Sequence, residues 1–186
     1  FIEAFQRAFP NQNDVGCVLK VMNSTESPIW NECIRRSLCD ERIHVVTETL
    51  IRSDLLALMN CCDSIVSLHR AEGFGRVMTE AMLMKKPVIA SEYSGNLDYM
   101  TNKNGFLVTG RTVPIFKNEY LFARGNVWFQ PNIEDAAEKM KYIVANKELV
   151  LKKVDNAYHD ISTMYSKKTV GNKLKILINR LKRDGV

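Results

Sequence analysis

Short apolar runs alternate with amphipathic stretches along the first two thirds of the chain. Five of the runs are strand-like, and they cover residues 15–22, 43–46, 64–68, 87–91 and 105–108. Strands that alternate with helices at this spacing predict a parallel sheet with right-handed crossovers and helices on its faces. The pattern therefore predicts the α/β fold class.

Helical periodicity fills the intervals between these runs and continues to the end of the chain. The predicted helices cover residues 1–9, 27–38, 53–61, 74–85, 95–100, 133–145, 147–164 and 167–183. Ser27 followed by Pro28 is typical of a cap and a first helical residue, and Pro10 ends the first helix. We expect an α/β domain at residues 1–146 and C-terminal helices at residues 147–186 that pack on that domain or cross from it.

Residues 109–131 interrupt the alternation and form a long connection that carries Pro114, Gly125, Trp128 and Pro131. Connections of this length in compact domains are often functional. The segment is either a lid, a small hairpin or an insertion packed on the surface.

The last predicted helix has an apolar face and a basic face. The apolar face consists of Val170, Leu174, Leu177, Ile178 and Leu181. The basic face consists of Lys167, Lys168, Lys173, Lys175, Arg180, Lys182 and Arg183. Either the helix docks on the core with a solvated basic face, or it contacts an anionic membrane surface.

Composition places the chain among single globular domains. It has 186 residues, of which 46% are hydrophobic and 25% charged, and no apolar run approaches the roughly 20 residues that span a bilayer. The net charge of +5 suits anionic partners such as nucleoside diphosphates, but the basic residues are too dispersed to indicate nucleic acid. The first helix starts without a cap or a Met, so we expect a fragment of a longer protein.

Cysteine and histidine spacing gives no metal site. The five cysteines form no C-x-x-C pair and the three histidines are scattered. Reduced thiols in a cytosolic protein are the simplest interpretation.

The informative stretch runs from residue 67 to residue 98. A predicted strand ends near Leu68, Gly73-Phe74-Gly75 follows, and a helix begins. A helix N-terminus presents unpaired N–H groups and a partial positive charge, and glycines let a phosphate approach the backbone. The stretch therefore predicts an anion site at the carboxyl end of a parallel strand.

Two glutamates, Glu72 and Glu80, flank this turn. A carboxylate is not needed for phosphate, so Glu72 indicates hydrogen bonds to neutral hydroxyls such as those of a sugar. Glu80 lies on an otherwise apolar helix, and adjacent ribose hydroxyls would satisfy its two oxygens. The alternative for Glu80 is an i, i+4 ion pair with Arg76.

This pattern resembles the donor-binding domain of the family 4 retaining glycosyltransferases. The resemblance rests on Glu72-Gly73-Phe74-Gly75, Glu80-Ala81-Met82, Lys86-Pro87-Val88-Ile89-Ala90 and Tyr93-Ser94-Gly95-Asn96. It implies the Rossmann-like C-terminal half of a GT-B fold. Ser94 replaces the second glycine that is commoner in this family.

The resemblance also implies roles for individual residues. Glu72 corresponds to the catalytic-site acid that contacts the transferred sugar, and Glu80 to the ribose-binding acid. Donor-binding positions are Lys20 (phosphates), Thr49 and Leu50 (base), Gly73, Phe74 and Gly75 (sugar and diphosphate), and Ser94. Arg70 either neutralises the leaving diphosphate or is a surface arginine.

The implied reaction is retaining transfer of a glycosyl group from a nucleoside-diphosphate sugar to a saccharide or lipid-linked acceptor, without metal or cofactor. No Asp-x-Asp motif occurs in the chain. The family's first donor-domain strand, its Arg–Lys loop and the acceptor domain would precede Phe1. We therefore expect weak donor binding and no transfer by this fragment alone. The resemblance also suggests polysaccharide assembly, in the cytoplasm or peripheral to the membrane.

Three other interpretations stay open. Gly73-x-Gly75 with Glu92 imitates a nicotinamide-nucleotide fingerprint, but Met78 occupies the third glycine position. A nucleotide-sugar epimerase shares the architecture. A non-catalytic nucleotide-binding module is the third.

Overall fold

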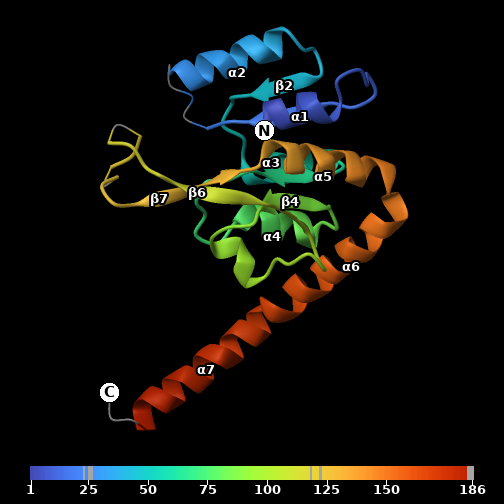
Figure 1. Ribbon diagram of the computed structural model, residues 1–186. Helices are drawn as coiled ribbons and strands as arrows, with labels where there is room; N and C mark the ends of the chain where they lie inside the picture. The colour runs from blue at the N-terminus through green and yellow to red at the C-terminus, as the bar shows by residue number, and fades with distance from the viewer. Residues whose placement is uncertain (23, 25–26, 118, 122, 184–186) are drawn as a thin grey trace.

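The computed structural model describes residues 1–22, 24, 27–117, 119–121 and 123–183, and these form an α/β arrangement (Figure 1). Positions 118 and 122 of the predicted connection and residues 184–186 of the predicted C-terminal unit lie outside the described residues. The strands are β1 (Cys17–Lys20), β2 (Ile43–Val46), β3 (Ile65–Ser67), β4 (Val88–Ser91), β5 (Phe106–Val108), β6 (Gly110–Pro114) and β7 (Val127–Pro131). The helices are α1 (Ile2–Ala8), α2 (Pro28–Leu38), α3 (Arg52–Cys61), α4 (Arg76–Leu83), α5 (Ile133–Ala145), α6 (Lys147–Met164) and α7 (Lys167–Arg183), with a 3₁₀ helix, η1, at Gly95–Asp98.

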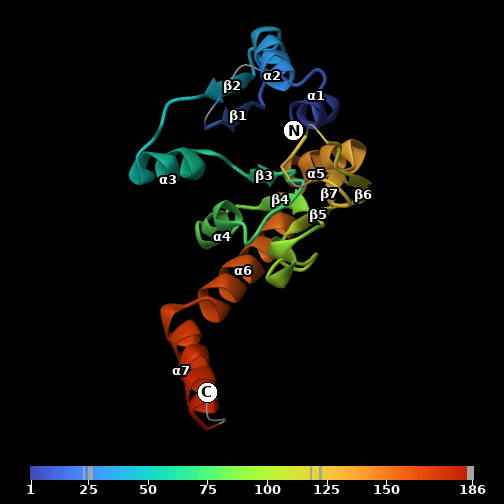
Figure 2. The same cartoon turned by 90° about the vertical axis from the view of Figure 1, so that its left-hand side faces the viewer.

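The first five strands are parallel, which confirms the predicted fold class. Strand β1 pairs with β2, and β3, β4 and β5 pair in that order. The hydrogen bonds thus divide the strands into two parallel sheets rather than one. Figure 2 shows the β1–β2 sheet with α2 apart from the larger sheet, which α4 and α5 flank.

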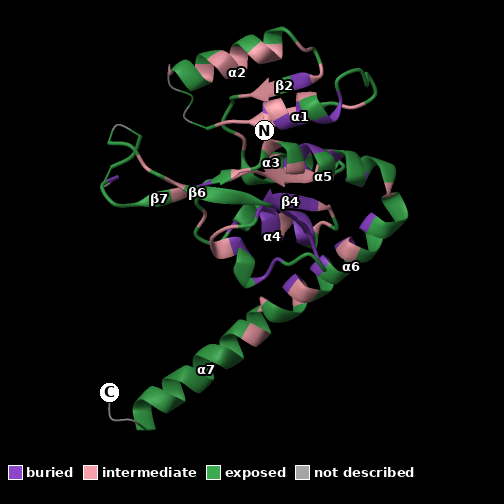
Figure 3. Ribbon diagram, viewed as in Figure 1, coloured by how far each residue is buried: buried purple, intermediate pink, exposed green. Residues whose placement is uncertain are grey.

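The buried apolar side chains form two clusters. All four residues of β4 are buried, because β4 is the middle strand of its sheet and has side chains packed on both faces. One apolar cluster joins α1 and α5 to Ile43, Ile89 and Val108, and a second joins α4 and α6 to Val88 and Leu107. Buried residues accordingly concentrate around β4, α1, α4 and α5 in Figure 3.

Two of the predicted helices differ from the structure by more than one residue at an end. Helix α4 begins at Arg76 rather than at residue 74, because Gly75 adopts a left-handed conformation with φ of 86° and serves as the N-cap. The helix predicted at residues 95–100 is only the short η1. The predicted start of α2 is confirmed, since the Ser27 side chain accepts a hydrogen bond from Trp30 N–H at 3.1 Å.

Residues 109–131 contain an antiparallel hairpin, so the hairpin interpretation is confirmed. Strand β6 pairs with β7 from Gly110 opposite Pro131 to Pro114 opposite Val127. The two prolines stand at strand ends, where a missing N–H costs little. The hairpin projects from the body of the molecule (Figure 1).

The C-terminal helices behave differently from each other. Helix α6 buries Val150, Val154, Ala157 and Ile161 and packs against α4. Helix α7 buries no residue and extends away from the body (Figure 1), so the core-docked interpretation of this helix is wrong for the described chain. Its contact with an anionic membrane surface stays a prediction. None of the described helices is long and apolar enough to span a bilayer.

Candidate functional site

The turn between β3 and α4 leads into a helix whose N-cap residue, Gly75, provides no side-chain hydrogen bond, and we call this helix start uncapped. It lies at the carboxyl end of a parallel strand. Strand β3 ends at Ser67, and no side chain caps α4 at Gly75. The N–H groups of the first helical turn lack intrahelical partners and concentrate partial positive charge. This is the anion-binding geometry expected at the carboxyl edge of an open α/β sheet.

A second loop, at Ser94 and Gly95, is locked onto this turn. The Ser94 hydroxyl donates to the Glu72 carbonyl oxygen at 2.6 Å and accepts from Glu72 N–H at 3.1 Å. Gly95 N–H also donates to the Glu72 carbonyl at 3.0 Å. Ser94 has a φ of 81°, a region that a non-glycine residue occupies at a cost of about 1–3 kcal/mol. The Ser94 side chain, predicted as a donor ligand, thus holds the backbone of Glu72.

The Glu72 carboxylate lies over the glycine turn. Its Oε1 accepts a long hydrogen bond of 3.4 Å from Phe74 N–H. Tyr99, which the sequence analysis overlooked, supports the same turn from beneath by donating its hydroxyl to the Gly75 carbonyl at 3.0 Å. Burial, with a smaller contribution from the Glu72 charge, raises the pKa of Tyr99, so this hydroxyl stays a donor at neutral pH.

The Phe74 side chain anchors the turn to α6. Its ring centroid lies 5.2 Å from that of Tyr99 and 5.5 Å from that of Tyr165, and the two tyrosines also meet edge to face. Such aromatic pairs contribute about 0.5–1.5 kcal/mol each beyond the area they bury. Phe74 therefore places its own backbone amide at the head of α4.

Glu80 faces α3 and is largely shielded, with 16% of its side chain exposed. Its Oε1 lies 2.9 Å from Arg52 Nη2 and 3.6 Å from Arg76 Nη2. The alternative pair with Arg76 is thus present, but the closer partner is Arg52, at the start of α3. Val77 and Leu83 are half exposed, so α4 is less buried than its apolar sequence predicted.

Glu80 also lines a cleft between α4 and α6. The cleft has a volume of about 440 Å³. Its walls include Phe74, Arg76, Thr79, Glu80, Leu83, Ile161 and Tyr165. Glu72 is not among its lining residues, so the two glutamates flank the turn without sharing this cleft.

His69 joins the ends of β3 and β4 behind the turn. Its Nδ1 lies 3.1 Å from Ser67 Oγ, and its Nε2 lies 2.9 Å from the Tyr93 carbonyl oxygen and 3.2 Å from Asn96 Oδ1. Ser91 Oγ donates to the His69 carbonyl at 2.7 Å. No role for His69 was predicted from the sequence, although small polar residues at the ends of neighbouring parallel strands were a usable signal.

His69→Ala is expected to lower the free energy of unfolding by about 1–3 kcal/mol, because it leaves polar groups behind the turn without their partner. Urea titration of the purified protein measures this. His159→Ala is the matched control, since His159 is exposed on α6 and should change stability by less than about 0.5 kcal/mol. Equal effects of the two variants would contradict the network.

Arg70 connects the turn to the hairpin. Its guanidinium carbon lies 3.6 Å from the ring centroid of Trp128, and its carbonyl oxygen accepts from Phe129 N–H at 2.8 Å. The Phe129 ring stacks on Tyr93 with centroids 5.1 Å apart and an interplanar angle of 6°. This link between the hairpin and the site was not predicted from the sequence.

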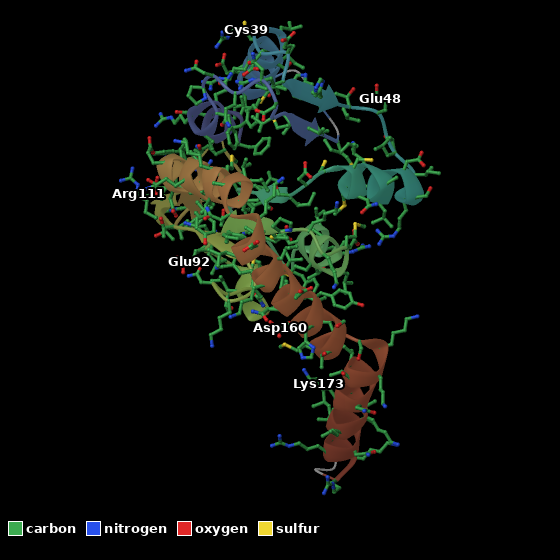
Figure 4. All side chains as sticks on the ribbon, turned by 90° about the vertical axis from the view of Figure 1, so that its right-hand side faces the viewer. Cys39, Glu48, Glu92, Arg111, Asp160 and Lys173 are labelled. Atoms are coloured by element: carbon green, nitrogen blue, oxygen red, sulfur yellow. The ribbon has the colours of Figure 1, made fainter. Side chains whose placement is uncertain are left out.

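Three predicted donor-binding residues lie on the smaller sheet or on the connection that follows it. Lys20, at the end of β1, donates to the Val21 carbonyl at 2.8 Å. Thr49 is exposed and Leu50 half-buried on the connection between β2 and α3, where Figure 4 labels the neighbouring Glu48. Within the described chain no hydrogen bond joins these three residues to the turn, whereas Arg52 links the connection between β2 and α3 to Glu80.

The described residues contain no group of three or more His, Cys, Asp or Glu side chains that could hold a metal ion.

Comparison with solved structures supports the fold. Anabaena HepE, crystallised with UDP, matches with a TM-score of 0.70 and 20% identity over 96% of this chain and 44% of that one. The C-terminal domain of the group 1 glycosyl transferase LpcC from Francisella tularensis matches with a TM-score of 0.66 and 20% identity, covering 90% of this chain and 78% of that domain. A glycosyltransferase from Rickettsia africae matches with a TM-score of 0.69 and 23% identity over 97% of this chain and 43% of that one.

This chain therefore spans less than half the length of HepE and of the Rickettsia enzyme. No curated protein matches the sequence significantly. The family model described as "Glycosyl transferases group 1" matches residues 1–121, which is more than half of the chain. The chain belongs to the group 1 glycosyl transferases, and its fold is that of a GT-B C-terminal domain.

Proposed function

We propose that this chain is the donor-binding domain of a retaining glycosyltransferase that uses a nucleoside-diphosphate sugar. The uncapped start of α4 at Gly75, flanked by Glu72 and Glu80, is the observation that carries the proposal. HepE, which shares the fold, has been crystallised with UDP and with UDP-glucose, and this supports a donor of the same class.

The backbone amides and the two glutamates at the site each have a proposed role. Backbone amides from Phe74 to the first turn of α4 bind the diphosphate, and Glu72 accepts hydrogen bonds from the sugar. Glu80 binds the ribose hydroxyls. Arg52 and Arg76 both contact its Oε1, whereas no described residue donates a hydrogen bond to its Oε2, which stays available to the ribose.

The proposed chemistry is displacement of the nucleoside diphosphate from the anomeric carbon with retention of configuration. Negative charge grows on the leaving phosphate oxygens, so fixed amides and cations lower the barrier without a need for metal. The acceptor is a saccharide or a lipid-linked saccharide.

Acceptor binding and part of the phosphate site are proposed to lie outside this chain. Among the described strands, β1 pairs only with β2, and β3 only with β4. In a doubly wound sheet of order 3-2-1-4-5-6, a further strand would lie between β1 and β3 and would join the two sheets. The loop after that strand would bring the proposed Arg–Lys pair to the diphosphate.

Nucleoside diphosphates are expected to raise the Tm of the complete protein, and NAD is not. At a ligand concentration 100 times Kd, binding contributes about 2.7 kcal/mol, which shifts Tm by several degrees. A thermal-shift panel of UDP, GDP, ADP and NAD measures this. Stabilisation by NAD alone would overturn the proposal in favour of a nicotinamide-binding domain.

Nucleoside diphosphates would also raise the Tm of a nucleotide-sugar epimerase or of a non-catalytic binding module. Incubation of the complete protein with the stabilising nucleotide's sugar conjugates, without added metal, separates the three. Transfer to a saccharide acceptor supports the proposal. An isomerised donor would indicate the epimerase, and an unchanged donor would indicate the module.

A further inference from the structure

We propose that Trp128, on the β6–β7 hairpin, is a positioning residue of the donor site and holds Arg70 ready for the diphosphate. This inference rests on the proposed function. It assigns a function to the β6–β7 hairpin, which contacts the turn through Trp128 and Phe129.

Contact with the indole leaves the N–H donors of Arg70 available. The guanidinium carbon lies 3.6 Å from the centroid of the Trp128 ring, so the cation rests against the face of the ring. The N–H donors of a guanidinium point outward in its own plane, where they match pairs of phosphate oxygens. A stacked arginine therefore keeps its donors available while its position is fixed.

Arg70 also forms no ion pair with any of the described residues. The ion pairs found within the described chain involve Arg7, Arg35, Arg36, Arg42, Arg52 and Arg76, but not Arg70. The side chain is exposed and lies two residues before Glu72 in the turn. An unpaired cation beside an uncapped helix start favours an anionic ligand at that place.

Contacts at several points fix the hairpin in place, so it can hold the Arg70 side chain. Phe129 N–H donates to the Arg70 carbonyl at 2.8 Å, and the Phe129 ring stacks on Tyr93, next to Ser94. At its base, Asp135 accepts from Thr109 N–H at 2.6 Å and from the Thr109 hydroxyl at 2.7 Å. The hairpin is thus tied to both loops of the site and to α5.

The Trp128 ring meets Arg70 through its face. The indole Nε1 is buried and has no hydrogen-bond partner among the described residues, so the described contact between the two side chains is the one between the guanidinium and the ring. Without the ring, Arg70 would sample several rotamers and lose conformational freedom when the diphosphate binds.

The test compares the affinities of the complete protein for UDP and for uridine by isothermal titration calorimetry. Trp128→Leu removes the aromatic face, and we expect UDP binding to weaken about fivefold, as loss of a cation–π contact implies. Uridine affinity should stay unchanged, because uridine has no phosphate. Trp128→Phe, which keeps a ring, should recover part of the loss.

Two further variants separate positioning from a structural effect. Tyr120→Ala removes an exposed aromatic elsewhere in the hairpin and should leave both affinities unchanged. Arg70→Gln should weaken UDP binding, and Trp128→Leu added to it should cost nothing more, because Trp128 acts through Arg70.

The outcomes distinguish this inference from the proposed function. If the wild-type protein binds UDP and Trp128→Leu binds it equally well, the positioning role is overturned and the donor site stands. Additive losses, or parallel losses of UDP and uridine affinity, would reduce Trp128 to a structural residue. If wild-type protein binds neither UDP nor any other diphosphate of the panel, the donor site itself is refuted, and the role of Trp128 with it.

Discussion

Glu80→Ala is expected to weaken nucleoside diphosphate binding by about 10- to 100-fold. Hydrogen bonds to a charged group contribute about 1.5–3 kcal/mol, and each 1.4 kcal/mol is a factor of ten in affinity. The shielded position of Glu80, with 16% of its side chain exposed, should bring its contribution toward the upper part of that range. Calorimetric titration of the complete protein with UDP measures the change.

The control for this variant is Lys85→Ala. Lys85 follows the C-terminal end of α4, is 56% exposed and lies 3.0 Å from Asp155, and exposed ion pairs contribute at most about 1 kcal/mol. Its removal should leave UDP affinity within about twofold of wild type. If Glu80→Ala binds UDP as tightly as wild type, Glu80 is only a partner of Arg52 and Arg76, and the ribose-binding role is lost.

Local patterns explain why much of the fold was predictable. Each strand of the α/β part is a short apolar run, and each helix has its own periodicity, so neither depends on distant contacts. The α2 start at Ser27 and Pro28 and the parallel pairing of β3, β4 and β5 follow from such signals. The division into two sheets does not, because periodicity does not specify which strand edges meet.

The contacts that organise the site are long-range, and here local patterns fail. Arg52 reaches Glu80 across 28 positions, and His69 reaches Asn96 across 27. The apolar sequence of α4 suggested a buried carboxylate in need of partners but did not identify Arg52. The hairpin was predicted as one of several alternatives, whereas its stack on Arg70 depends on tertiary packing.

Gly73→Ala is expected to weaken UDP binding by about tenfold or more without lowering the Tm of the free protein. A Cβ atom at this position would have no neighbouring atom within 4 Å, and its φ lies outside the left-handed region. The free protein therefore accepts the methyl group. A diphosphate or sugar resting on the turn would meet it, and overpacking of this kind costs about 1–3 kcal/mol.

Gly95→Ala provides the contrast, because its methyl group would meet protein rather than ligand. The Cβ atom would lie 1.9 Å from the Gly73 carbonyl oxygen, so the two loops would have to separate, and both Tm and UDP affinity should fall. Gly171→Ala, on α7 with no atom within 4 Å of the added Cβ, should leave affinity unchanged and Tm equal or slightly higher. Thermal denaturation and calorimetry of the three variants thus distinguish a glycine covered by ligand, where only affinity falls, from a glycine covered by protein, where Tm falls as well. Unaltered UDP affinity in Gly73→Ala would mean that the turn ahead of α4 does not touch the nucleotide.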